Sequence, residues 1–228
     1  MWRNLRAMES VCSSPARRLW IVAGLFLGTL VPSHAAILAN YNFTSATASV
    51  DADVNSTASN FTSNYSSNSG LSGAGNYFVR VQVTPALTDP VSTTNYFTFT
   101  VTAASGFTLN LADLTLKTAL VDSNQPTGTT FVRSSVDGFA FDLGSYTQTG
   151  TASSDFTDRT IDLSGAAYQN LSSITFRIYH YDDTDSTSST GLVHRIDDVV
   201  LNGSAIPEPA SFALLGLGGL SLLARRRR

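Results

Sequence analysis

The chain has 228 residues, 43% of them hydrophobic, with 14 basic and 17 acidic side chains and a formal net charge of −3. Its one cysteine excludes an internal disulfide framework, so a hydrophobic core has to provide the stability. The acidic surplus excludes nucleic acid as a partner, because affinity for phosphates rests on clustered basic residues.

Residues 1–35 have the composition of a secretory signal peptide. Four arginines lie before residue 19, residues 19–31 are apolar, and Ser33 and Ala35 place small side chains at the end. Export machinery recognises and cleaves this succession of a basic, an apolar and a small-residue region. We therefore expect a signal helix, cleavage between Ala35 and Ala36, and passage through the secretion machinery.

Removal of this segment changes the charge balance. Residues 36–206 hold six basic side chains against fifteen aspartates, a formal net charge of −9, and no cysteine, tryptophan or glutamate. Such an acidic surface suits a soluble extracellular or cation-binding protein.

From residue 36 to residue 201, alternating or β-rich segments recur between turn signals, which predicts an all-β domain over residues 36–204. The predicted strands cover residues 36–43, 76–84, 95–102, 107–121 with a break near Asp113, 129–135, 139–146, 160–163, 173–181 and 194–201. Asp137-Gly138 predicts a tight hairpin turn between two of them. The Ser-, Thr- and Asn-rich residues 45–75 predict a long loop or a weak edge strand.

Eight or nine strands, polar turns and no amphipathic helix predict a two-sheet antiparallel β-sandwich of the jelly-roll type. We expect its first and last strands to lie close together. The stretches RSSVDGF at 133–139 and RIDDVVLNG at 195–203 are similar in layout to carbohydrate-binding-module and laminin-G-like sandwiches. This resemblance rests on turn and strand residues that any sandwich needs, and it implies carbohydrate binding as one candidate function.

An acidic loop contains the first candidate calcium ligands. Asp183 and Asp185 alternate in the sequence DDTDST, which follows a predicted strand, and Ca²⁺ takes oxygen ligands from carboxylates. The alternative interpretation is a solvated loop tip.

A second candidate calcium site lies between the ends of the domain. Asp197 lies in the last predicted strand, and Asn40 or Asn42 in the first strand could add an amide oxygen, as the resemblance to carbohydrate-binding sandwiches implies. The alternative is that Asp197 pairs with Arg195 across the strand face while Asp198 is exposed.

Tyr179 and Tyr181 share one face of the predicted strand 173–181 and are candidates for stacking on sugar rings. The alternative for both is packing in a core or an interface. His180 and His194 are the only histidines in residues 36–206, and no Gly-x-Ser-x-Gly motif accompanies them. We therefore predict no catalytic residues and expect that the protein is not an enzyme.

The chain closes with Pro207-Glu208-Pro209, the uncharged residues 210–224, and then Arg225, Arg226, Arg227 and Arg228. Fifteen helical residues span about 22 Å, against about 30 Å for the hydrocarbon core of a bilayer, and flanking arginines can reach the interface. We expect a short transmembrane helix at about 210–224 with a cytoplasmic C-terminus. The two prolines display Glu208 on a stiff, extended joint outside it.

This order of Pro-Glu-Pro, apolar span and arginine cluster resembles the PEP-CTERM sorting signal of exported bacterial proteins, here over residues 205–228. The resemblance implies that a membrane-embedded exosortase recognises the tail and cleaves it near Pro-Glu-Pro. It also implies a transient membrane anchor, then a place at the cell surface or with extracellular polysaccharide. The alternative is a short membrane anchor without processing.

Overall fold

The computed structural model describes residues 36–50, 53–65, 69–81, 94–121, 127–151, 155–182 and 192–208. The predicted signal peptide with Ala35, the predicted membrane span at 210–224, Pro209, the four terminal arginines, Asp183 and Asp185 lie outside the described residues. Within the ranges that are described, no helix combines the length and the apolar composition needed to cross a membrane.

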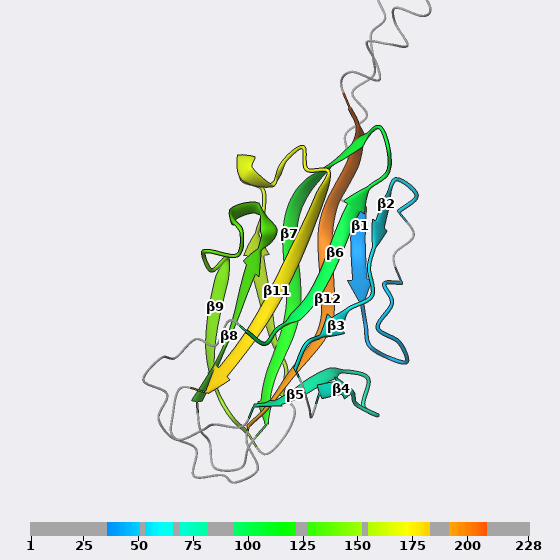
Figure 1. Ribbon diagram of the computed structural model, residues 1–228. Helices are drawn as coiled ribbons and strands as arrows, with labels where there is room; N and C mark the ends of the chain where they lie inside the picture. The colour runs from blue at the N-terminus through cyan, green and yellow to red at the C-terminus, as the bar shows by residue number, and fades with distance from the viewer. Residues whose placement is uncertain are drawn as a thin grey trace, which may run out of the picture. The chain divides into compact units, whose positions relative to one another are not determined.

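One sheet, here called sheet A, has the strand order β10-β7-β12-β5-β4, and β1 also pairs with β12 (Figure 1). Its strands are β1 (Ala36–Tyr41), β4 (Ser69–Leu71), β5 (Tyr77–Val81), β7 (Phe107–Val121), β10 (Thr157–Asp162) and β12 (Leu192–Pro207). The antiparallel pairing of β1 with β12 confirms that the first and last strands of the domain lie side by side.

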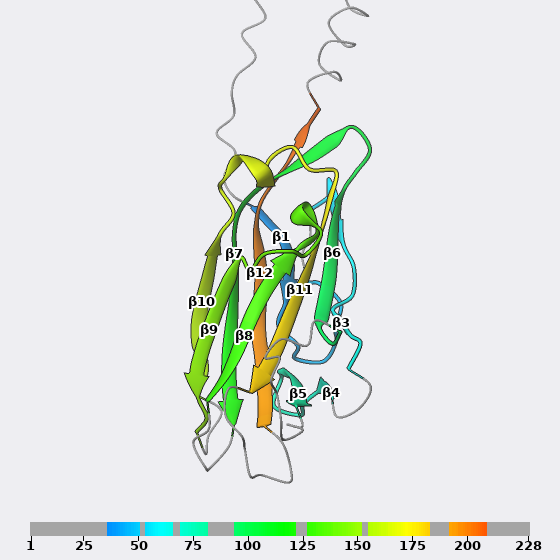
Figure 2. The ribbon, with the colours of Figure 1, turned by 60° about the vertical axis from the view of Figure 1, so that its left-hand side comes forward.

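The second sheet, sheet B, has the order β2-β6-β11-β8-β9, and β3 also pairs with β6. Its strands are β2 (Ser56–Ala58), β3 (Thr62–Ser63), β6 (Phe97–Ala103), β8 (Thr127–Ser134), β9 (Gly144–Thr149) and β11 (Ser173–Asp182). Two short 3-10 helices, η1 (Ser135–Asp137) and η2 (Ala166–Tyr168), lie between strands. Figure 2 shows the sheets as two layers, and the predicted two-sheet antiparallel β-sandwich is confirmed.

The hydrophobic core lies between the two sheets. Strand side chains alternate between faces, and the apolar positions of β6 and β11 all fall on the inner face: Phe97, Phe99, Val101, Ile174, Phe176 and Ile178. Aromatic rings form the largest group in this core, with neighbouring centroids 4.9 to 6.3 Å apart: Tyr41, Phe43, Phe61, Tyr77, Phe97 and Phe99. Such rings bury a large apolar area each and dominate the energetics of a core.

Residues 45–75 contain the short strands β2, β3 and β4. β2 and β4 end the strand orders of sheets B and A, so the predicted weak edge strand is found as short edge segments. Phe61, in the same polar stretch, is only 1% exposed and lies in the aromatic group of the core. Burying the ring of Phe61 fastens this polar segment to the sandwich.

One detail of the predicted strands is confirmed in part and another is wrong. β7 is one continuous strand, but it is irregular at the predicted break near Asp113: Asn202 pairs with Asp113 and Gly203 with Leu111, so Ala112 is an extra residue of β7. The other irregularity of this pair lies in β12, between Asp197 and Val200. The turn predicted at Asp137-Gly138 is present, but β9 starts at Gly144 rather than at residue 139. Residues 139–143 are instead held by side-chain hydrogen bonds, which the next subsection describes.

β12 continues to Pro207, three residues beyond the predicted end of the domain at residue 204. At Gly203 the strand passes so close to its neighbours that a Cβ atom would lie 2.5 Å from the carbonyl oxygen of Asn110 and 2.8 Å from the side chain of Leu38. Glycine is required here because the obstructing carbonyl belongs to the backbone of β7.

Candidate functional site

Side chains of sheet B that point away from the core gather around β8 and β11. This outer-face cluster consists of Tyr96, Phe131, Arg133, Phe139, Arg177, Tyr179 and Tyr181. Tyr179 lies opposite Phe131 in the register of β11 and β8, and their rings stack 4.7 Å apart with an angle of 7° between planes. Directly opposite residues of an antiparallel pair bring their side chains into contact, so the register itself produces this stack.

Two arginines lie over the rings of this cluster. The guanidinium carbon of Arg177 is 3.7 Å from the ring centroid of Phe139 and 4.2 Å from that of Tyr96. The guanidinium carbon of Arg133 is 5.0 Å from the centroid of Phe131 and 5.7 Å from that of Tyr179. Each cation–π contact of this kind contributes about 0.5–2 kcal/mol, depending on how far water is excluded.

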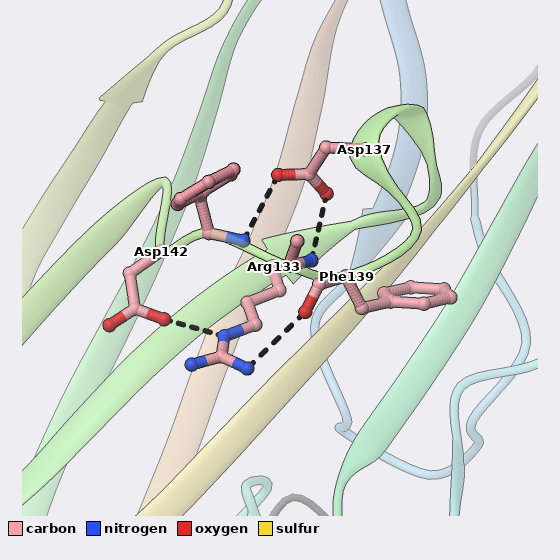
Figure 3. Close-up of polar contacts among 6 residues, drawn as sticks. Arg133, Asp137, Phe139 and Asp142 are labelled. Carbon is pink, nitrogen blue, oxygen red and sulfur yellow. Dashed lines mark hydrogen bonds and ion pairs between the residues drawn. The ribbon is translucent and has the colours of Figure 1, made fainter.

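The loop after η1 supplies Phe139, and four polar contacts shape it (Figure 3). The carboxylate of Asp137 accepts hydrogen bonds from the backbone N–H groups of Ala140 and Phe141, at 3.2 and 3.1 Å. Nε of Arg133 is 2.6 Å from a carboxylate oxygen of Asp142, and its Nη1 donates to the carbonyl oxygen of Phe139 at 3.2 Å. Both carboxylates beside the cluster therefore hold the loop in place.

These contacts maintain Phe139 in an unfavourable backbone conformation. Its φ is 66°, in the left-handed region that costs an aromatic residue about 1–3 kcal/mol. The conformation turns the ring onto Arg177, while the neighbouring Phe141 is 74% exposed. Strain of this kind concentrates at functional sites, which is why the cluster is the candidate binding surface of the domain.

The two tyrosines predicted to stack on sugars have different environments. Tyr179 is 1% exposed, because its ring lies among Phe131, Tyr96 and Arg133. A buried ring offers no free face, so the predicted two-tyrosine platform is wrong for Tyr179, and the packing alternative describes it. Tyr181 is partly exposed and contacts the edge of Phe131 at 5.9 Å.

The aspartates of the last strand lie at the irregularity of β12. Asp198 has a φ of 45° and forms an ion pair with Lys117, with 2.8 Å between Nζ and the carboxylate oxygen. The carboxylate of Asp197 accepts the backbone N–H of Asp198 at 2.8 Å, and burial raises the pKa of Asp197 above its usual range. Asn40 lies on β1 opposite Val200, close along β12 to these carboxylates.

The described part of this region is a poor fit to calcium on its own. Ca²⁺ takes six to eight oxygen ligands, and one of the two adjacent carboxylates here, that of Asp198, already neutralises the ammonium of Lys117. Among the described residues, no group of three or more histidine, cysteine, aspartate or glutamate side chains could hold a metal ion. The calcium sites at Asp197 with Asn40 and at Asp183 with Asp185 stay predictions.

His180 and His194 meet between the sheets, His180 from β11 and His194 from β12. Their ring centroids are 4.6 Å apart, and Nδ1 of His180 shares a hydrogen bond with Oγ1 of Thr130 at 2.8 Å. Nε2 of His180 is buried and has no hydrogen-bond partner in the described structure. Burial, and then the charge of His194, hold the pKa of His180 well below its ordinary value of 6.5.

The outer-face cluster and the histidine pair both depend on which residues face each other across strands. Alternation along one strand predicted that Tyr179 and Tyr181 share a face, but it carries no information about the register with β8. Phe131, Arg133 and the pairing of the two histidines were therefore missed.

The sorting residues lie directly at the end of the sandwich. Pro207 pairs with Phe107 in the last step of the β12–β7 ladder, and both Pro207 and Glu208 are exposed. The backbone N–H of Glu208 donates to the carbonyl oxygen of Gly106 at 2.8 Å.

Residues 205–228 match the family model of the PEP-CTERM protein-sorting motif, which confirms the resemblance of the tail. The chain thus carries the sorting motif of an exported protein that is processed at its C-terminus. The match covers the tail alone and leaves the sandwich unassigned.

A comparison with curated protein sequences found no match. Among solved structures, the K3 cleaved adhesin domain of Lys-gingipain from Porphyromonas gingivalis is similar at 16% identity and a TM-score of 0.44, covering 73% of this chain and 99% of that one. The CBM22-1 xylan-binding domain of Xyn10C from Paenibacillus barcinonensis is similar at 12% identity and a TM-score of 0.38, covering 75% and 96%. Similarity at this level carries no inference for this chain.

Proposed function

We propose that the protein is an exported, non-enzymatic β-sandwich that an exosortase sorts to the cell surface or the extracellular matrix. In this proposal residues 1–35 are removed as a signal peptide, the apolar residues 210–224 anchor the chain transiently in the membrane, and residues 36–204 form the delivered domain. The observation that carries the proposal is the PEP-CTERM motif at residues 205–228, joined to a cysteine-free β-sandwich.

The charge of the chain supports this route. Eight of its fourteen basic residues lie in the two proposed transport segments, four before residue 19 and four at the C-terminus. The domain between them keeps a formal charge of −9, and such a charge favours solubility outside the cell. The structural or adhesive role of the domain would then follow from its surface rather than from catalysis.

The test is the intact mass of the protein isolated from its native cells. We expect a mass that lacks residues 1–35 and a segment that begins near Pro209, and we expect Glu208→Ala to retain the tail. A wild-type protein of full mass would contradict both processing steps. A Glu208→Ala protein that is processed and located like wild type would remove the support for exosortase sorting.

The alternative function is that of a carbohydrate-binding module, with extracellular polysaccharide as the partner. It is favoured by the outer-face cluster, where the partly exposed Tyr181 contacts Phe131 and Arg133 lies over the ring of Phe131. The exposed Phe141 belongs to the loop that carries Phe139. Aromatic faces with a few fixed polar groups are the usual composition of a ligand site. In this alternative, calcium bound at Asp197 with Asn40, or at Asp183 with Asp185, would assist the binding of carbohydrate.

Binding to a glycan array, with and without a chelator, separates the two functions. Carbohydrate binding predicts a signal that Tyr181→Ala reduces, with Tyr168→Ala, on η2, as the control. A signal lost on chelation would support calcium-assisted binding. Absence of binding under both conditions would contradict the alternative and leave the structural role.

A further inference from the structure

The first residues of the sorting motif are also residues of the sandwich. Pro207 pairs with Phe107, and the N–H of Glu208 is hydrogen-bonded to the carbonyl oxygen of Gly106. No linker separates the strand from the motif, and the end of β12 lies beside the turn between β6 and β7 (Figure 1). An enzyme that recognises Pro207 and Glu208 therefore meets a backbone that is already paired with Phe107 and hydrogen-bonded to Gly106.

The strand end that carries the motif is held on one side only. Up to Gly203, β12 pairs with β7 on one side and with β5 or β1 on the other. From Ser204 to Pro207 it pairs, in the described structure, with β7 alone. We call this part the terminal ribbon, formed by residues 204–208 and 106–110. The β7 side of this ribbon is anchored, because Leu109 is buried and exchanges two backbone hydrogen bonds with Leu171. Residues 204–208 are paired, among the described residues, with one neighbour only, so this strand end can detach locally while the sandwich stays folded.

We propose that the terminal ribbon gates sorting: the exosortase binds Pro207 and Glu208 only after the ribbon has opened. The inference rests on the proposed function, because it takes the exosortase as the partner. A backbone N–H that donates to Gly106 cannot donate to an enzyme at the same time. Folding of the domain and recognition of its tail thus compete for the same residues, and the stability of the ribbon sets the processing rate.

Thr108 offers a way to change the ribbon without changing the motif. It lies opposite Ile206, and its hydroxyl oxygen is buried without a hydrogen-bond partner in the described structure. Thr108→Val replaces that hydroxyl with a methyl group of similar size and strengthens the pair, whereas Thr108→Gly weakens the strand. Cross-strand pairs of this kind change an opening equilibrium about two- to fivefold.

The experiment is a pulse-chase of the full chain in its native host, with the processed fraction followed over time. We expect Thr108→Val to be processed about two- to fivefold more slowly than wild type and Thr108→Gly faster by a similar factor. The control is Thr157→Gly, which weakens β10 opposite Thr118, at the far end of β7, and should keep the wild-type rate. Equal rates for wild type and both Thr108 variants would overturn the proposal, as would an equal acceleration by Thr157→Gly.

Hydrogen exchange of the full chain in detergent micelles tests the ribbon independently of the enzyme. The amide of Glu208 should be protected in wild type and less protected in Thr108→Gly. Exchange of this amide at the rate of an unstructured peptide would overturn the inference even if Glu208→Ala blocks processing. Protection of the amide together with normal processing of Glu208→Ala would support the ribbon and contradict exosortase recognition, so the two failures are distinguishable.

Discussion

At the scale of single residues, the loop after η1 shows how polar contacts support an unfavourable backbone. Phe139 has a φ of 66°, in the left-handed region, which is unfavourable for a residue with a bulky side chain. The compensation comes from Asp137 and Arg133 around it and from the contact of its ring with Arg177. The outer-face cluster therefore depends on carboxylates that do not touch the aromatic rings themselves.

We predict that Asp137→Ala destabilises the loop and weakens the cluster. The change removes the acceptor of two backbone N–H groups, those of Ala140 and Phe141, and should lower the free energy of unfolding by about 1 kcal/mol. Urea unfolding measures the loss, and Asp137→Asn should recover part of it because an amide oxygen still accepts. If Asp137→Ala unfolded at the wild-type midpoint, the loop would not depend on this carboxylate.

The histidine pair predicts a pH dependence of stability. The pKa of His180 is lowered in the folded protein, so below about pH 6.5 the unfolded chain binds more protons than the folded one. Stability should therefore be constant above that pH and fall on acidification, by up to about 1.4 kcal/mol per pH unit for one such group. The groups beside the ring are His194, Thr130 and Phe97.

Urea unfolding of wild type and His180→Gln at pH 7.5 and pH 5.5 checks this dependence. The free energy of unfolding of His180→Gln should differ less between the two pH values than that of wild type, because the variant lacks the residue that has to stay neutral in the folded protein. The same difference in both proteins would assign the acid sensitivity to other groups.

At the scale of elements, Gly203 lies where β12 passes close to the backbone of β7 and to Leu38 of β1. We predict that Gly203→Ala lowers the free energy of unfolding by about 1–3 kcal/mol, because its Cβ would lie 2.5 Å from the backbone oxygen of Asn110. Gly165→Ala is the matched control, since a Cβ there meets nothing within 4 Å. Thermal unfolding of both variants measures the effect, and equal midpoints would show that β7 can move away.

The sequence predicts those elements that form through interactions between residues close together in the chain. Alternation within β6 and β11 is a property of neighbouring residues, so the strands predicted at residues 95–102 and 173–181 are found close to their predicted ranges. The start of β9 and the burial of Tyr179 depend on Asp137, Arg133 and Phe131, which contact them across a loop or a neighbouring strand. The burial of Phe61 likewise depends on rings from β1, β5 and β6, and nothing in residues 45–75 predicts it.

At the scale of the whole molecule, β12 is both a central strand of the sandwich and the strand that ends in the sorting motif. β12 pairs with β7, β5 and β1, and its far end carries the first residues of the sorting motif. A protein processed near Pro209 therefore keeps every described pair of β12, and the delivered domain loses no part of its core.

This arrangement predicts different outcomes for two truncations of the domain at residues 36–208. A chain that ends at Gly203 loses only the β12 side of the terminal ribbon, residues 204–208, and should still unfold cooperatively, with a loss of about 1–3 kcal/mol. A chain that ends at Asp198 also loses the buried Val199 and Leu201 and every residue with which β1 pairs. Two large apolar side chains contribute about 3–6 kcal/mol by burial, a large part of the stability of a small domain.

Circular dichroism during heating distinguishes the three chains. We expect a sharp transition for the chains that end at residues 208 and 203, and none for the chain that ends at residue 198. A cooperative transition in the shortest chain would mean that β1 does not need β12. Loss of the transition in the chain that ends at Gly203 would mean that the ribbon is an integral part of the sandwich, and an exosortase would then meet its motif only in an unfolded domain.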